Sequence, residues 1–375
     1  MGDRLKKKQL ILGLLAIVAL AGLAVWGRGR IHFDFGVFRT QVAQADWRLI
    51  GIGIGCIYLG LVLRAARWAY LIRYQKKVSP LSLVSPQVLG FTAVALIGRV
   101  ADPVRPYLVS KKTNLELSAQ FAVYVVERLF DAGSLALIFS IAMLWVPTEE
   151  IMKAMPHTGP LAQLGAHHAL LSSLIARYGG LILTLLGALF LVLVRVGSNS
   201  FAALCEQGVG LVSRKLGEAI GHRIRAFRNG LSAMHSLGDL ASVLGLSLAM
   251  WVLIALAYLL SCRAFVAAPE LASITPQKSV LVMVASGGAS IFQLPILGWF
   301  TQVGLVAIVL SLVLGAGHEA ATACAATLLL VTFLSIVPVG LIWAQFEHVS
   351  LRNVTAESEH AGDDLDVAES TGAAQ

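Results

Sequence analysis

Three charged residues, Glu127, Arg128 and Asp131, interrupt an otherwise apolar stretch of this sequence. If the helix that carries them begins near Ser118, Glu127 lies roughly 14 Å along it, close to the middle of a hydrocarbon core about 30 Å thick. Residues four apart share a helix face, so Glu127 and Asp131 are predicted to point the same way, with Arg128 at the flank. Each charge costs at least about 2.5–3.5 kcal/mol at that depth, so all three must face protein or water.

A second group of charges, Arg99, Asp102 and Arg105, precedes this helix in a segment that glycine and proline break. Arg99 and Arg105 are the candidate partners of the acidic pair. Two interpretations stay open: a structural ion-pair network that pins the broken segment to the next helix, or a polar cavity that receives a charged headgroup or a coupling ion. The two can coexist, because acids can hold arginines in place for an anionic ligand, and the guanidinium fork suits phosphate geometry.

Two further arginines, Arg64 and Arg67, lie beside Trp68 near the end of an earlier apolar stretch. This pattern is typical of interfacial anchoring, in which arginines snorkel to the headgroups and tryptophan lies in the aromatic belt. Anchoring is therefore the favoured interpretation. The alternative is a headgroup contact at the mouth of the cavity.

Uncharged polar and small residues mark a second break in the chain, between residues 279 and 317. Gln293, Pro295, Gly298 and Gln302 could line a substrate path there, or serve equally well as helix-packing positions. The four cysteines form no metal-binding spacing. The sequence therefore predicts no catalytic motif, no metal site and no cofactor.

The amino-acid composition sets the class of protein. The chain has 375 residues, of which 57% are hydrophobic and only 13% are charged, about half the charged share of a soluble domain. Most of the surface must therefore face lipid or other helices. The net charge is +8, and the basic residues lie in short loops between apolar spans, which indicates cytoplasmic loops rather than nucleic-acid binding.

The sequence predicts an all-α polytopic membrane protein with about six full transmembrane helices and two broken or re-entrant hairpins. The expected full helices are residues 10–26, 47–72, 118–145, 171–194, 240–264 and 320–343. The first is expected to be retained rather than cleaved as a signal peptide, and the basic run before it places the N-terminus in the cytoplasm. One hairpin is expected to begin at residue 86 and break around residues 98–106, the other to lie within residues 279–317. Eight full helices are the alternative.

The order of these segments predicts an inverted repeat. Each half contains a hairpin followed by a helix, the first hairpin entering from inside and the second from outside, as in many secondary transporters. Residues 1–348 are expected to form one transmembrane domain, with a basic amphipathic segment, residues 195–238, on the cytoplasmic surface. Residues 349–375 are acidic and low in apolar residues, and are expected to form a disordered cytoplasmic tail.

Three stretches together resemble the transmembrane region of lysylphosphatidylglycerol synthases and its stand-alone flippase-like relatives. They are the Arg67-Trp68 end of the second helix, residues 98–105 and residues 126–131. That family typically reads P-x-R-x-G-E-x-x-R in the middle stretch and E-R-x-x-D after it. Here Ile97, Ala101 and Asp102 replace the Pro, Gly and Glu. A glycine-rich stretch of the family that ends in Glu is echoed by residues 294–298, with Gln302 where the Glu would stand.

The resemblance implies translocation of a lipid or lipid-linked substrate. The first hypothesis is therefore a lipid flippase or transporter, in which an anionic headgroup enters the cavity at Arg99 and Arg105 and the two hairpins alternate access. The soluble aminoacyl-transferase domain of the full synthases is not expected in this chain, which is therefore not expected to make lysyl-lipid. Two alternatives are a membrane-embedded lipid-modifying transferase that uses Glu127 and Asp131, and a non-transporting scaffold that docks such an enzyme on residues 195–238. The expected partners are lipids with anionic headgroups, in the cell inner membrane, with both termini cytoplasmic.

Overall fold

The computed structural model describes residues 33–147, 236–289 and 297–347, together with residues 178, 179, 181, 182 and 185. Every element within these residues is a helix or a helical turn. Several predictions fall outside the described residues. They are the first helix, the 171–194 span apart from those five residues, nearly all of the basic segment 195–238, the acidic tail, and the positions of Gln293 and Pro295.

Three long helices form the centre of the fold: α3 (Trp47–Ile72), α6 (Leu117–Leu144) and α12 (Leu237–Arg263). Their 26, 28 and 27 residues extend about 40 Å, which is more than the thickness of a hydrocarbon core. Side chains cap the starts of two of them. The Asp46 side chain accepts the backbone N–H of Arg48 at the start of α3, and Ser236 and Asp239 form a capping box at the start of α12.

The described helices confirm the predicted class of membrane protein. Four stretches are long and apolar enough to cross a membrane: Trp47–Ile72, Pro80–Ile97, Gly238–Arg263 and His318–Phe346. α6 has the length as well, but the three charges in its middle set it apart from these. Its charged face therefore has to be covered by protein or by a polar cavity.

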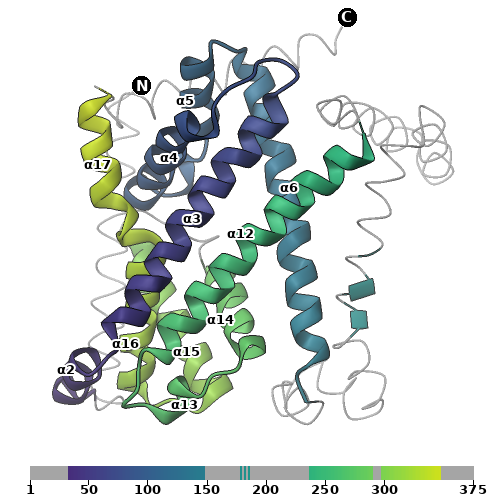
Figure 1. Cartoon of the computed structure of the whole chain (residues 1–375). Helices are drawn as coiled ribbons and strands as arrows, with labels where there is room; N and C mark the ends of the chain where they lie inside the picture. The colour runs from purple at the N-terminus through teal and green to yellow at the C-terminus, as the bar shows by residue number, and fades with distance from the viewer. Residues whose placement is uncertain are drawn as a thin grey trace, which may run out of the picture.

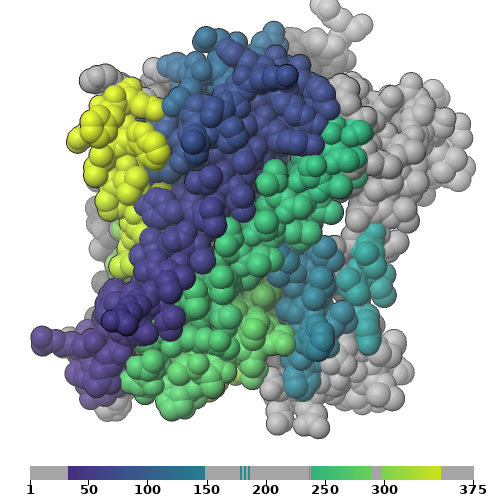
Figure 2. Space-filling view, in the orientation of Figure 1, coloured from purple at the N-terminus to yellow at the C-terminus, as the bar shows by residue number. Residues whose placement is uncertain are grey.

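α3 and α12 pack along each other in antiparallel directions, and Figure 2 shows them as adjoining diagonal bands in purple and green. The start of α3 meets the end of α12, where the Asp46 backbone N–H donates to the Ala264 carbonyl over 2.8 Å. At the opposite end, Arg73 and Asp239 form an ion pair of 2.5 Å. Small residues allow this close packing, since a Cβ atom added at Gly53 would lie 3.2 Å from a side chain of α12.

The chain between α3 and α6 folds into a helical hairpin of η1 (Pro80–Leu83), α4 (Val84–Ile97), η2 (Arg99–Ala101) and α5 (Val104–Thr113). Gly98 makes the break after α4 with a φ of 94°, a conformation that residues with side chains rarely adopt. Lys112, near the end of α5, donates to Ser85 Oγ at the start of α4 over 2.9 Å. Both ends of the hairpin therefore lie at one end of the molecule, as predicted. Its first arm, Pro80–Ile97, has the length of a membrane span, whereas α5 has only 10 residues.

The second half repeats this order. After α12 come α13 (Pro269–Ala272), α14 (Pro276–Ala289), α15 (Leu297–Leu314) and a bent span of α16 (His318–Leu329), η5 (Leu330–Leu334) and α17 (Ile336–Phe346). η5 is a π-helical turn in which the Ser335 N–H bonds the Leu330 carbonyl, five residues back. Pro338 follows and removes a further helical hydrogen bond, which accounts for the irregular backbone here. α2 (Phe35–Ala43) packs against α16.

The two hairpins enter from opposite ends of the molecule. In Figure 1, α4 and α5 occupy the upper half, while α14 and α15 occupy the lower half beside α13. They meet where the Trp299 indole N–H, near the start of α15, donates to the Ala95 carbonyl, near the end of α4, over 3.1 Å. α14 has 14 residues, about 21 Å of helix, which is too short to cross a bilayer core. The arrangement matches the predicted inverted repeat.

Candidate functional site

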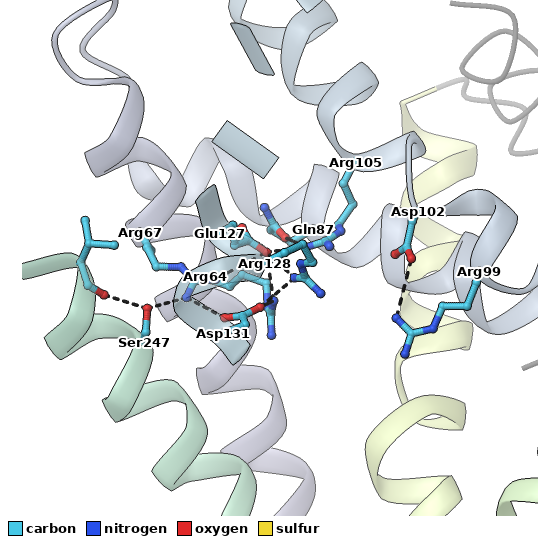
Figure 3. A network of polar contacts seen from close by, with 11 residues as sticks. Arg64, Arg67, Gln87, Arg99, Asp102, Arg105, Glu127, Arg128, Asp131 and Ser247 are labelled. Carbon is cyan, nitrogen blue, oxygen red and sulfur yellow. Dashed lines mark hydrogen bonds and ion pairs between the residues drawn. The ribbon is translucent and has the colours of Figure 1, made fainter. Parts of the chain in front are cut away.

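Glu127 lies at the centre of a buried ion-pair network, which Figure 3 shows from close by. Its Oε1 atom lies 3.0 Å from Arg64, 2.9 Å from Arg105, 2.6 Å from Arg128 and 3.5 Å from Arg67. The Glu127 side chain is fully buried. The guanidinium groups therefore replace the water that would otherwise solvate this carboxylate.

Asp131, one helical turn further along α6, completes the network. Its carboxylate oxygens lie 2.9 Å from Arg64, 2.7 Å from Arg67 and 2.8 Å from Arg128. The predicted shared face of Glu127 and Asp131 is confirmed, because both acids contact the same arginines. Four arginines meet two carboxylates, which leaves an excess of two positive charges within the network.

Arg105 reaches Glu127 from α5 because α4 leaves room for its stem. A Cβ atom added at Gly90 would overlap Arg105 Cγ, so this position of α4 has space for glycine alone. The Arg105 guanidinium lies 5.0 Å from the ring centre of Phe91 and 5.1 Å from that of Tyr124, a cation–π arrangement. Contacts to α4 and α6 thus hold the hairpin against the rest of the first half.

The interfacial role predicted for Arg64 and Arg67 is wrong. Their side chains are only 7% and 1% exposed, and Trp68 beside them is fully buried and donates its indole N–H to Gln120 over 3.0 Å. Arg67 also donates to Ser247 of α12 over 2.6 Å. The physical reason is that α6 and α12 cover this part of α3 and bring carboxylate and hydroxyl partners to the two arginines.

Arg99 and Asp102 stand apart from the network, which corrects the expectation that Arg99 pairs with the acids of α6. Arg99 Nη1 lies 3.7 Å from Asp102 Oδ2, and the Arg99 side chain is 40% exposed. The two residues flank the short turn that follows Gly98, and Figure 3 shows this pair away from Glu127. Of the two predicted partners, Arg105 contacts the acids, whereas Arg99 pairs within its own turn.

A cavity of about 500 Å³ adjoins the network and lies between the two halves of the fold. The wall from the first half carries the five charged residues, Arg64, Arg99, Asp102, Arg128 and Asp131, beside apolar ones such as Leu61 and Phe91. The other wall comes from α12, α14 and η5 and is mostly apolar, with Met250, Ile254 and Met283 among its residues. The cavity therefore offers ion pairing on one side and hydrophobic contact on the other.

Arg128 is the arginine of the network with the most exposure. Its side chain is 34% exposed, against 7% or less for the other three. Glu127 and Asp131 both hold its Nη2 atom, so the guanidinium is oriented before any ligand arrives. Of the two arginines considered for the cavity mouth, Arg64 is in the wall, and Arg67 is buried outside it.

Two of the four residues predicted to line a path in the second half are described. Gln302 is in the cavity wall and donates to Ser286 Oγ over 2.9 Å, whereas Gly298 is buried outside the wall. Sequence reasoning missed Tyr258 and Thr332, which also line the cavity. The sequence feature that could have identified these two residues is a hydroxyl group inside an otherwise apolar span. Among the described residues, no group of three or more His, Cys, Asp or Glu side chains is placed to hold a metal ion.

The fold and the cavity define a polytopic helical membrane protein with a ligand-sized space between two inversely arranged halves. The family model of the lysylphosphatidylglycerol synthase TM region matches residues 10–343, and the chain belongs to this family. Comparisons with curated proteins and with solved structures found no match. Family membership points to a lipid-related function, and it confirms the resemblance to this family.

Proposed function

We propose that this protein is a transporter, not an enzyme, that moves an anionic lipid or lipid-linked substrate between the leaflets of the cell inner membrane. The observation that carries the proposal is the cavity of about 500 Å³, because its charged and apolar walls suit the two chemically different ends of such a molecule. A volume of this size is typical of small-molecule sites. It suits a headgroup together with the first part of the acyl chains.

The charged wall favours an anion. The network contains four guanidinium groups and two carboxylates, so two positive charges lack a counter-charge within it. Excess charge is costly inside a membrane. A phosphate oxygen against Arg128 would offset part of this excess, and the planar guanidinium offers the donor geometry that phosphate accepts.

The two hairpins supply a route for alternating access. They enter from opposite ends of the molecule and touch through the Trp299–Ala95 hydrogen bond. In an inverted repeat, movement of one repeat against the other opens a central site to one side at a time. Residues of η2 and η5 line the cavity, so irregular backbone faces the cavity, where it is tolerated at membrane depth.

Basic residues favour a cytoplasmic location for the end at which α3 finishes. Lys76 follows α3 and donates to the Thr113 carbonyl at the end of α5 over 2.7 Å. Lys111 and Lys112 lie in the last turn of the same helix. Basic residues that flank membrane spans stay in the cytoplasm, so we propose that this end of the molecule is cytoplasmic. We propose a cytoplasmic location for both termini as well.

Transport can be measured with purified protein in liposomes that carry fluorescent phosphatidylglycerol. The wild type should bring the inner-leaflet probe within reach of an added membrane-impermeant quencher, and phosphatidylcholine should move much more slowly. Arg128→Gln should reduce phosphatidylglycerol transport about tenfold, because it removes a charged hydrogen-bond donor from the cavity wall. The variant should still fold, since the other arginines keep the carboxylates paired.

The matched control is Arg39→Gln, which changes an exposed arginine of α2 outside the cavity and should leave transport at the wild-type rate. Equal transport by Arg128→Gln and the wild type would exclude Arg128 as the headgroup site. If a folded wild-type protein moves no phosphatidylglycerol at all, the proposed function is wrong.

A further inference from the structure

The second half of the fold contributes an uncharged polar group to the cavity wall. Ser286 Oγ, on α14, accepts hydrogen bonds from the Tyr258 hydroxyl over 2.8 Å and from Gln302 Nε2 over 2.9 Å. The Thr332 side chain, in η5, lies against the Tyr258 hydroxyl. All four side chains line the cavity. They come from four different elements, so the group exists only in the folded protein.

Three of these side chains, Tyr258, Gln302 and Thr332, have an oxygen atom that can accept a further hydrogen bond. The Tyr258 hydroxyl donates its hydrogen to Ser286 Oγ, and the Thr332 hydroxyl donates its hydrogen to the Leu328 carbonyl over 2.7 Å. Gln302 Oε1 is buried and has no hydrogen-bond partner, although the whole side chain is only 3% exposed. An unpartnered buried acceptor is costly, so this arrangement of lone pairs favours a ligand that carries positive charge.

We infer that Tyr258 Oη, Gln302 Oε1 and Thr332 Oγ1 form part of a binding site for a monovalent metal cation, Na⁺. Hard cations bind oxygen ligands, and a divalent ion is disfavoured because this group has no carboxylate to balance a second charge. None of these side chains has an ordinary pKa near neutrality, so a proton would not bind here in place of the metal cation. Irregular helical segments such as η5 supply cation ligands in transporters built from inverted repeats.

The charged wall and the uncharged polar group within the mostly apolar wall would then bind opposite charges. An anion beside Arg128 and a cation beside Gln302 attract each other across a space of low dielectric constant, so each should bind more tightly when the other is present. Na⁺ would thereby be the coupling ion of the transporter. This coupling rests on the proposed function, whereas Na⁺ binding itself does not.

Na⁺ binding can be measured on the purified full-length protein in detergent, with radioactive sodium and by thermal melting. NaCl should raise the melting temperature above its value in choline chloride at equal ionic strength, and sodium binding should saturate. Thr332→Val and Gln302→Leu should each weaken binding at least about tenfold. Thr322→Val is the matched control, because this hydroxyl also bonds the carbonyl four residues back in the same bent span but lies outside the cavity.

Gln302→Glu separates loss of the site from misfolding, since it keeps an acceptor and adds a negative charge; it should bind Na⁺ more tightly than the wild type. Equal melting in NaCl and choline chloride, with no saturable sodium binding, would overturn the inference. Stabilisation by methylammonium but not by Na⁺ would also overturn it, and would assign these oxygens to an amine of the substrate. Sodium binding without lipid transport would reject the proposed function and leave the ion site standing.

Discussion

Replacing Glu127 by alanine should leave little folded protein. One oxygen of this carboxylate lies within 3.5 Å of four arginines, and the side chain is fully buried. Its removal would leave buried guanidinium groups opposed by Asp131 alone. Breaking a buried ion pair by removing one partner costs about 3–5 kcal/mol, a large part of the stability of a typical domain. The melting temperature and the folded peak in size-exclusion chromatography would show the loss.

Glu116→Ala is the control for this variant, because Glu116 belongs to the same helix. It stands at the N-cap of α6, and its side chain makes no capping hydrogen bond. The control should therefore melt close to the wild type. If Glu127→Ala also melts like the wild type, then the network does not hold α6 against α3 and the hairpin.

Gly90→Ala should strongly destabilise the protein, although it adds only one methyl group. The added Cβ atom would overlap Arg105 Cγ, and the Arg105 guanidinium cannot move aside without leaving Glu127. Overpacking a tight core costs about 1–3 kcal/mol, and loss of the ion pair would add to this. A lower melting temperature, measured in the same detergent as the wild type, is the expected result.

Gly133→Ala is the matched control for the added methyl group. Gly133 is also helical, and an added Cβ atom there meets nothing within 4 Å. Alanine favours a helix interior over glycine by about 0.8–1.0 kcal/mol, so this variant should be at least as stable as the wild type. If the two alanine variants melt alike, the stem of Arg105 does not occupy the space beside Gly90.

The frame of the fold and the centre of the site could be predicted from the sequence, because both depend on local patterns. The lengths of the apolar stretches located α3, α12 and the final bent span. Basic flanks around a stretch broken at Gly98 and Pro103 indicated a hairpin rather than two spans. The spacing of Glu127 and Asp131 placed both acids on one face of α6.

The partners of these acids depend on tertiary packing, and the sequence did not reveal them. Arg64 and Arg67 resemble interfacial anchors because Trp68 and the end of an apolar stretch lie beside them. The coverage of this part of α3 by α6 and α12 decides otherwise. Packing also separates Arg99 from the acids, although Arg99 lies closer to them in sequence than Arg64 does.

A structural network and a polar cavity, which the sequence left as alternatives, are two parts of one cluster. Glu127 and Arg105 are buried outside the cavity wall and join α5 to α6. Arg128 and Asp131 belong to the same set of ion pairs and also line the cavity. Substitution of Glu127 should therefore act first on stability, and substitution of Arg128 first on transport.

The most direct test of lipid binding in the cavity is photolabelling with phosphatidylglycerol that carries a diazirine on its acyl chain, followed by mass spectrometry. Binding in the cavity predicts adducts on Met250 or Met283, displaced by unlabelled phosphatidylglycerol and lost in Arg128→Gln. Leu312 of α15 is 80% exposed and reports lipid that merely surrounds the protein. Labelling of Leu312 without labelling of the cavity methionines would contradict the binding of lipid in this cavity.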